Sequence, residues 1–202
     1  MDRCQETLFF RHACKEFDGR EIPEEDLTYI LEAGRLSPSS FGMEPWRFLV
    51  VSDPETKAKL RPLCWNQKQI TTCSHLVIIK NQIALVQDDA YIEAMFARRG
   101  LDPEATAAYI KRYKEFLAKQ DIPVWTAKQC YIAMESMLLA AAFRKIDSCP
   151  IEGYEKERVE EFLGLDPAKE QVAIIVAFGY RKREQPPKRR LDLNQLVEWK
   201  RN

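Results

Sequence analysis

The longest strongly apolar stretch of the chain spans residues 127–145, and it limits the possible folds more than any other feature. It has the length of a helix and includes Ile132, Met137, Leu138 and Phe143. Apolar residues surround most of the circumference of such a helix, which is typical of a buried helix. A chain of 202 residues is expected to form one domain, here 1–202, around one core. The helix is therefore expected at the centre of that core or at a subunit interface.

Other segments with regular patterns predict a mixture of helices and strands. Residues 46–52 are rich in aromatic and β-branched residues, and residues 76–79 form a short apolar run without alternation, as in a strand buried on both faces. A third strand is expected over 172–178. We expect helices over residues 2–10 (bringing Leu8 and Phe9 to the core), 24–36, 54–62, most of 83–120, and 155–163.

The charge balance argues against several classes of partner. The chain has 31 basic and 31 acidic residues, so no long-range field favours nucleic acid or an anionic membrane. No apolar run reaches the roughly 18 residues that a membrane-spanning helix needs. The first residues lack the apolar core of a secretion signal, so a cytoplasmic protein is expected.

The six cysteines show no metal-binding spacing, and no metal site is expected. In a reducing cytoplasm we expect them to remain free thiols. Cys14 lies between Arg11 and Lys15, and nearby cations lower the pKa of a thiol. A structural role for Cys14 is nevertheless favoured over a catalytic one.

Two segments stand out for their chemistry: 11–18 (RHACKEFD) and 35–48 (RLSPSSFGMEPWRF). Serine hydroxyls and loop N–H groups can hold a polar planar ring or a phosphate, and Pro38 and Pro45 restrict the backbone that presents them. Alone, the second segment is better explained by a helix end followed by a buried tryptophan, because clusters of Ser, Pro and Gly mostly form loops.

These two segments, followed in order by 66–69 (NQKQ), 149–154 (CPIEGY), 177–181 (AFGYR) and 188–190 (KRR), resemble the nitroreductase family of FMN-dependent NAD(P)H oxidoreductases. The resemblance extends over residues 4–199. It implies an α+β fold with a central, mostly antiparallel sheet flanked by helices. It also implies a homodimer with FMN at the subunit interface, and a C-terminal extension that reaches the partner subunit.

The resemblance assigns cofactor roles to particular residues. Arg11, Lys188 and Arg190 would bind the FMN phosphate, and Lys15 would stabilise the reduced flavin near N1 and O2. Gln69 stands where many members have a second lysine. The other expected FMN contacts are His12 and Ala13 through the backbone, Asn66 at the pyrimidine edge or ribityl chain, Pro150, Ile151, Glu152 (its N–H toward N5) and Gly153 under the ring, and Ser37, Pro38, Ser39 and Ser40 from the other subunit.

The acceptor site is expected on the open face of the flavin. Phe41 and Gly42 would border it, and Trp125 would either line it or pack in the core. The variable region 83–124 is where the choice of acceptor is expected to be decided.

The implied reaction is a ping-pong transfer of hydride from NADH or NADPH to FMN N5, and then to a nitroaromatic, a quinone or a similar small molecule. The protein would supply no catalytic side chain, because the flavin carries the chemistry. Other reductive reactions on the same fold, such as dehalogenation, enone reduction or flavin breakdown, remain alternatives. So do a flavin-binding redox sensor with little turnover and a flavin-free interaction domain.

Overall fold

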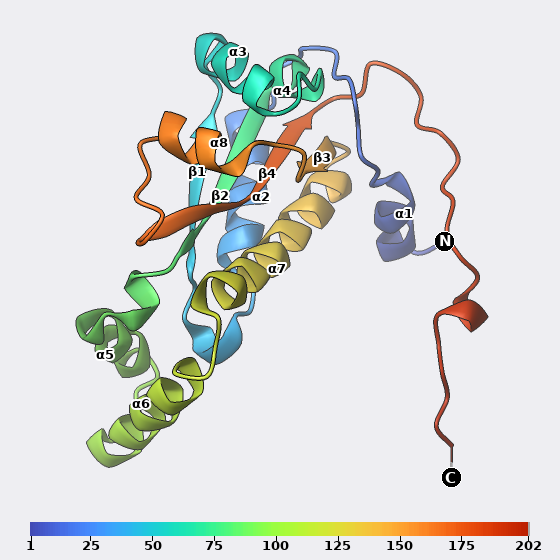
Figure 1. Ribbon diagram of the computed structural model, residues 1–202. Helices are drawn as coiled ribbons and strands as arrows, with labels where there is room; N and C mark the ends of the chain where they lie inside the picture. The colour runs from blue at the N-terminus through green and yellow to red at the C-terminus, as the bar shows by residue number, and fades with distance from the viewer. Residues whose placement is uncertain (202) are drawn as a thin grey trace.

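A four-stranded antiparallel sheet forms the centre of the computed structural model, which describes residues 1–201 (Figure 1). Asn202, the last residue of the expected domain, lies outside the described residues. Neighbouring strands follow the order β1-β2-β4-β3. The strands are β1 (Trp46–Val51), β2 (His75–Gln82), β3 (Asp147–Ile151) and β4 (Glu170–Gly179). The expected α+β architecture with an antiparallel sheet is therefore confirmed.

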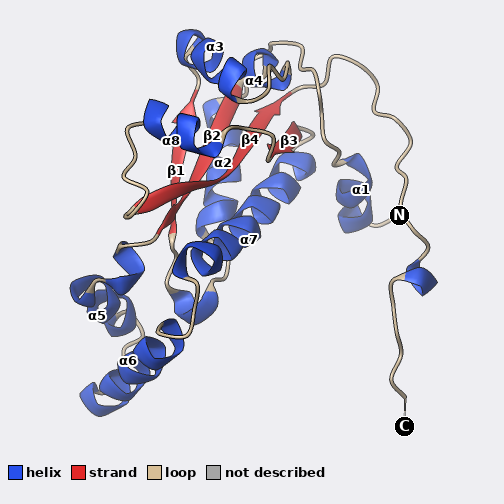
Figure 2. Cartoon of the chain, viewed as in Figure 1, coloured by secondary structure: helices blue, strands red, loops and turns tan. Residues whose placement is uncertain are grey.

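Helices cover both faces of the sheet (Figure 2). Residues of α2 and α7 pack on one face, and residues of α3, α4 and α8 pack on the other. The α-helices are α1 (Arg3–Phe10), α2 (Glu24–Arg35), α3 (Pro54–Leu63), α4 (Gln69–Thr72), α5 (Asp89–Ala97), α6 (Pro103–Leu117), α7 (Ile122–Phe143) and α8 (Lys156–Phe162); short 3-10 turns lie at Ser40–Gly42, Leu85–Gln87 and Leu193–Gln195.

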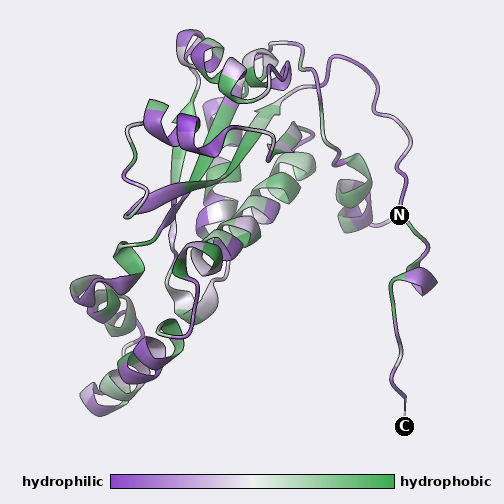
Figure 3. Cartoon of the chain, viewed as in Figure 1, coloured by the Kyte–Doolittle hydropathy of each residue, from purple (hydrophilic) through white to green (hydrophobic). Residues whose placement is uncertain are grey.

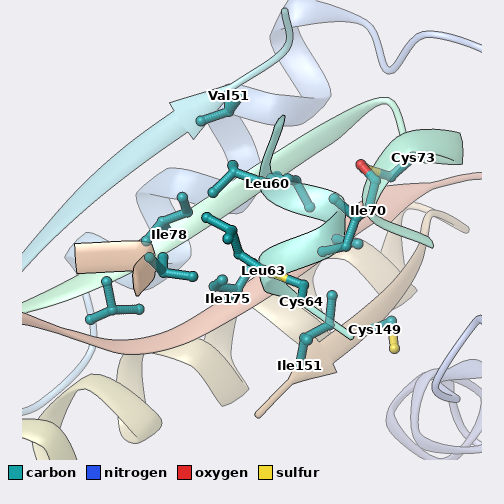
Figure 4. Close-up of a cluster of buried hydrophobic side chains, with 14 of the residues drawn as sticks. Val51, Leu60, Leu63, Cys64, Ile70, Cys73, Ile78, Cys149, Ile151 and Ile175 are labelled. Atoms are coloured by element: carbon teal, nitrogen blue, oxygen red, sulfur yellow. The ribbon is translucent and has the colours of Figure 1, made fainter. Parts of the chain in front are cut away.

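The central strands have apolar residues on both faces, as expected for β2. Leu76 and Ile78 belong to the cluster under α3, α4 and α8, whereas Val77 and Ile79 belong to the cluster under α2 and α7. Successive side chains of a strand point to opposite faces, so a strand between two helical layers needs apolar residues at every position. Figure 4 shows the first cluster, in which Leu60 lies near Ile78 and Ile70 lies toward Cys73.

A third cluster forms beyond the sheet, beneath α5 and α6. Its buried members include Met43, Phe96, Tyr113 and Trp125. Figure 1 shows α5 and α6 extending away from the sheet beside the N-terminal end of α7. The cluster joins this helical pair to the loop that precedes β1.

The long apolar helix is confirmed as α7, although it begins five residues earlier than expected. Asp121 caps it, accepting a hydrogen bond from the N–H of Val124 (3.2 Å). Ala133, Met137 and Ala141 are buried against the sheet, but Ile132 is 41% exposed. The helix therefore occupies the centre of the core and also presents apolar surface outward. Within residues 1–201, no helix combines the length and the apolar character that crossing a membrane requires.

Two expectations about local structure are wrong. Residues 3–10 do form a helix, but Leu8 and Phe9 are 48% and 55% exposed. The helix α1 packs against α7 at the periphery of the fold, and Thr7 is its buried residue. The strand β3 had no strand-like pattern, and the strand expected over 172–178 is the fourth rather than the third. Pro150 lies within β3, where a missing N–H is tolerated because β3 is at the edge of the sheet.

The C-terminal tail leaves the sheet after β4 and passes α1 (Figure 3). It carries exposed apolar residues, with Leu193 and Trp199 each 73% exposed.

Candidate functional site

The segment 11–15 lies against the edge strand β3. The N–H of Cys14 donates to the carbonyl of Ser148 (3.0 Å), and Ala13 forms a parallel bridge with the same residue. This pairing fixes Arg11 and Lys15 beside the end of β3. Two of the expected cofactor segments, distant in sequence, therefore meet at one edge of the sheet.

A chain of polar contacts joins a third expected segment to these two. Lys15 Nζ lies 3.5 Å from the sulfur of Cys149, and Gln69 Nε2 lies 3.9 Å from the same sulfur. Gln69 also donates to Gln67 Oε1 (2.8 Å), and Gln67 donates to the carbonyl of Gly153 (2.7 Å). Lys15, Gln69 and Gly153 were expected at the flavin, whereas Cys149 and Gln67 had no assigned role.

The surroundings of the Lys15 side chain bear on its expected role. Lys15 is exposed, and within residues 1–201 no carboxylate lies within salt-bridge distance of it. Burial raises the pKa of the Cys149 thiol, so the sulfur beside Lys15 is neutral near pH 7. An unneutralised cation at this position fits the expected stabilisation of an anionic reduced ring.

Gly153 faces a tryptophan in this structure. A Cβ at Gly153 would lie 2.7 Å from Trp65 Cε3 and 3.0 Å from Gln67 Nε2, so the loop requires a glycine here. Trp65 and Asn66 both have positive φ angles (53° and 54°), and both are exposed. Asn66 is therefore an exposed residue between Trp65 and Gln67, the two residues that lie against Gly153.

Four basic residues, Arg11, Lys188, Arg189 and Arg190, line a cavity of about 540 Å³ near the start of the tail. Lys188 Nζ donates to the carbonyls of Leu8 (2.6 Å) and Arg11 (2.5 Å). Burial lowers the pKa of Lys188, and repulsion from Arg11 and Arg190 lowers it further. Within residues 1–201, none of the four forms an ion pair with a carboxylate. We call this the basic cavity, and its charge fits a phosphate group.

A buried ion pair contacts His12 and Gln185, two of the residues that line the basic cavity. Arg181 Nη2 lies 2.6 Å from Asp147 Oδ1, and its Nε donates to Oδ2 (3.0 Å); the Asp147 side chain is 3% exposed. His12 Nδ1 lies 3.5 Å from the same carboxylate, and burial together with Arg181 lowers the pKa of His12. His12 therefore packs beside the buried pair.

Tyr131 on α7 contacts the candidate site, although no sequence pattern pointed to it. Its hydroxyl donates to Glu152 Oε1 (2.5 Å), and this contact ties the end of β3 to the central helix. A tyrosine within a long apolar helix looks like an ordinary core residue, so only the fold identifies this contact.

The segment 37–40 lies on a different side of α7. Ser37 Oγ donates to Ser136 Oγ (2.8 Å), and the N–H of Ser40 donates to Gln129 Oε1 (2.9 Å). Gln129 and Tyr131 are two residues apart, which places them about 200° apart around the helix. Within one chain, α7 therefore separates Ser40 from Glu152.

The expected acceptor residues lie over the third cluster. Phe41 has a φ of 55°, and its ring packs against Tyr113 (5.3 Å between centroids) and Phe116 (5.1 Å). Trp125 is only 6% exposed and packs among the same aromatic residues. Of the two alternatives for Trp125, its burial favours core packing.

Cys14 does not have the activated thiol that its neighbours suggested. It is buried, and burial raises its pKa to about 11, although the hydrogen bond to the Glu16 carbonyl and the charge of Arg181 lower it. We expect iodoacetamide at pH 8 to modify the exposed Cys4 at least about 100-fold faster than Cys14. Raising a thiol pKa from its ordinary value to about 11 lowers the thiolate fraction about 100-fold. Peptide mass spectrometry at several labelling times measures this ratio. Similar rates at the two thiols would contradict the burial argument, and the urea-unfolded chain, in which both should react, is the control.

Comparisons with known proteins show the family of the chain. The family model described as "Nitroreductase family" matches residues 8–180, so the chain belongs to the nitroreductase family. "Putative NAD(P)H nitroreductase YfkO" of Bacillus subtilis (strain 168) is 38% identical over 94% of this chain and 94% of its own length. A similarly named protein of Staphylococcus haemolyticus is 37% identical over 98% of this chain and 100% of its own length.

Solved structures share the fold. One from Exiguobacterium sibiricum, assigned as a nitroreductase and solved in complex with FMN, superposes with a TM-score of 0.84 at 26% identity, covering 99% of this chain and 98% of its own. The nitroreductase ydfN from Bacillus subtilis, also so assigned, gives a TM-score of 0.87 at 22% identity, covering 97% of this chain and 98% of its own.

Proposed function

We propose that this chain is an FMN-dependent NAD(P)H oxidoreductase that reduces nitroaromatics, quinones or similar small acceptors. The observation that carries the proposal is the convergence at the edge strand β3: the 11–15 segment, Gln69 and the end of β3 meet around Cys149, with the basic cavity close by. The family of the chain and its likeness to an FMN complex support it.

The residues divide into three tasks in this proposal. Arg11, Lys188 and Arg190 hold the phosphate, and Lys15 with Gln69 holds the pyrimidine edge. Glu152 and Gly153 would present backbone groups to the flavin ring. Bound FMN would supply the hydride-transfer chemistry between NAD(P)H and the acceptor.

A homodimer completes the site in this proposal. The separation of Ser40 from Glu152 by α7 supports it, because one chain could not bring both to the same ligand. The exposed apolar tail residues Leu191, Leu193, Leu196 and Trp199 are proposed to pack on the partner subunit. The serines 37–40 would then close the flavin site of the partner.

Steady-state kinetics test the reaction order. A single site that both donor and acceptor occupy in turn predicts parallel lines when reciprocal rates are plotted against reciprocal NAD(P)H at several acceptor concentrations. FMN-loaded protein with menadione as acceptor is the system to use. Converging lines would contradict alternate occupation of one site, and the absence of turnover with every nitroaromatic and quinone tried would contradict the acceptor class.

A further inference from the structure

The loop 41–44, which includes both expected acceptor-site residues Phe41 and Gly42, has an unusual backbone. Phe41 has a φ of 55° and Glu44 a φ of 44°. A residue other than glycine adopts this left-handed conformation at a cost of about 1 kcal/mol or more, and keeps it only where its surroundings hold it. The loop therefore needs fixed contacts from elsewhere in the chain.

Three side chains at α5 supply those contacts. Arg99 Nη2 donates to the carbonyl of Phe41 (2.7 Å), and Arg98 Nη2 binds Glu44 Oε1 (2.7 Å). The hydroxyl of Tyr91 donates to the carbonyl of Met43 between them (2.7 Å). The two strained residues are thus the two that the arginines hold.

The aromatic packing of Phe41 adds a second attachment to the same helical pair. Its ring lies against Tyr113 and Phe116 of α6, and Met43 is fully buried in the cluster beneath. These contacts couple the loop 41–44 to the α5–α6 pair, so a displacement of one is expected to displace the other. The position of Phe41 depends on side chains more than 50 residues away, in the region where acceptor choice was expected to be decided.

We propose that Tyr91, Arg98 and Arg99 are specificity-determining residues: by anchoring the loop 41–44 they fix Phe41 and so limit the size of the acceptor. The anchoring follows from the contacts alone, and the effect on acceptors rests on the proposed function. Releasing the loop lets Phe41 move, so bulky acceptors gain relative to small ones.

The first test measures the anchoring without any cofactor. Hydrogen exchange should be about 3- to 10-fold faster at the amides of residues 42–44 in Y91F, R98A and R99A than in the wild type, because each variant removes one anchoring bond. The double variant E44Q/R98A should exchange about as fast as R98A alone, since both changes remove one ion pair. K114A is the matched control, because Lys114 pairs with Asp89 (2.7 Å) and joins α6 to α5 without contacting the loop.

The second test measures kcat/KM for a small acceptor, benzoquinone, and a bulky one, anthraquinone-2-sulfonate, with the same variants. The ratio of bulky to small should rise at least about 3-fold in R98A and R99A and stay unchanged in K114A. Unchanged exchange in all three variants would overturn the anchoring. Faster exchange with an unchanged ratio would overturn the specificity role. A wild type that takes up no FMN would contradict the proposed function and the acceptor effect with it, while the exchange result still decides the anchoring.

Discussion

Replacing Arg11 and Arg190 together with alanine will weaken FMN binding about 100-fold or more. Each guanidinium lines the basic cavity, and within residues 1–201 neither has a carboxylate partner. A hydrogen bond to a charged group contributes about 1.5 to 3 kcal/mol, so losing two corresponds to at least about 100-fold in the dissociation constant. Fluorescence titration of the apoprotein with FMN measures the effect directly.

The control for this change is R183A. Arg183 is on the same tail and carries the same charge, but its side chain is 82% exposed and its ion-pair partner is Glu16, outside the basic cavity. It should bind FMN within about 2-fold of the wild type, as expected for a screened surface charge. An R11A/R190A protein that keeps its circular dichroism spectrum and binds FMN as tightly as R183A would contradict the phosphate role.

Replacing Asp147 with alanine will destabilise the protein by about 3 kcal/mol or more. Asp147 accepts from the backbone N–H of Arg181 (2.8 Å) as well as from its guanidinium, and its side chain is 3% exposed. Removing one partner of a buried pair leaves the other charge without compensation, at a cost of about 3 to 5 kcal/mol. Urea unfolding at a fixed protein concentration measures the change in free energy.

An exposed ion pair gives the comparison for D147A. Lys59 pairs with Glu55 (2.7 Å) on the surface of α3, and its side chain is 58% exposed. K59A should cost less than about 1 kcal/mol, because surface pairs on a helix contribute little. If D147A unfolded at the same urea concentration as K59A, the ion pair between Asp147 and Arg181 would not stabilise the folded state as predicted.

Strong hydrophobic patterns explain why most of the fold could be predicted. The β-branched run 76–79 and the apolar helix around Met137 each need cover on more than one side, and a central sheet between helical layers provides it. The strand β3 escaped prediction because its residues, Asp147 to Ile151, have neither alternation nor high strand propensity. Pairing with β4 determines that strand, and the local sequence does not reveal this pairing. Leu8 and Phe9 show the opposite error. They were expected in the core because they are apolar, but hydrophobicity alone does not determine which surface covers a side chain.

Only part of the candidate site could be predicted from the sequence. Motifs pointed to Arg11, Lys15 and Gly153, and the fold brings their segments to one edge of the sheet. The contacts of Cys149 with Lys15 and of Gln67 with Gly153 join residues 134 and 86 positions apart. Such contacts depend on strand register and side-chain direction, which a single sequence does not specify. The same holds for the arginines at α5, which look like an ordinary charged helix end until the loop 41–44 is placed beside them.

The most direct test of the central claim is the anaerobic absorbance of the purified protein at the flavin band, about 450 nm, on mixing with NADH or NADPH. The account predicts a yellow protein that bleaches with at least one donor and regains its colour when a nitroaromatic or a quinone is added. A yellow protein that neither donor bleaches would contradict the proposed reaction while leaving FMN binding intact. A colourless protein that takes up no added FMN would contradict the assignment of the site itself.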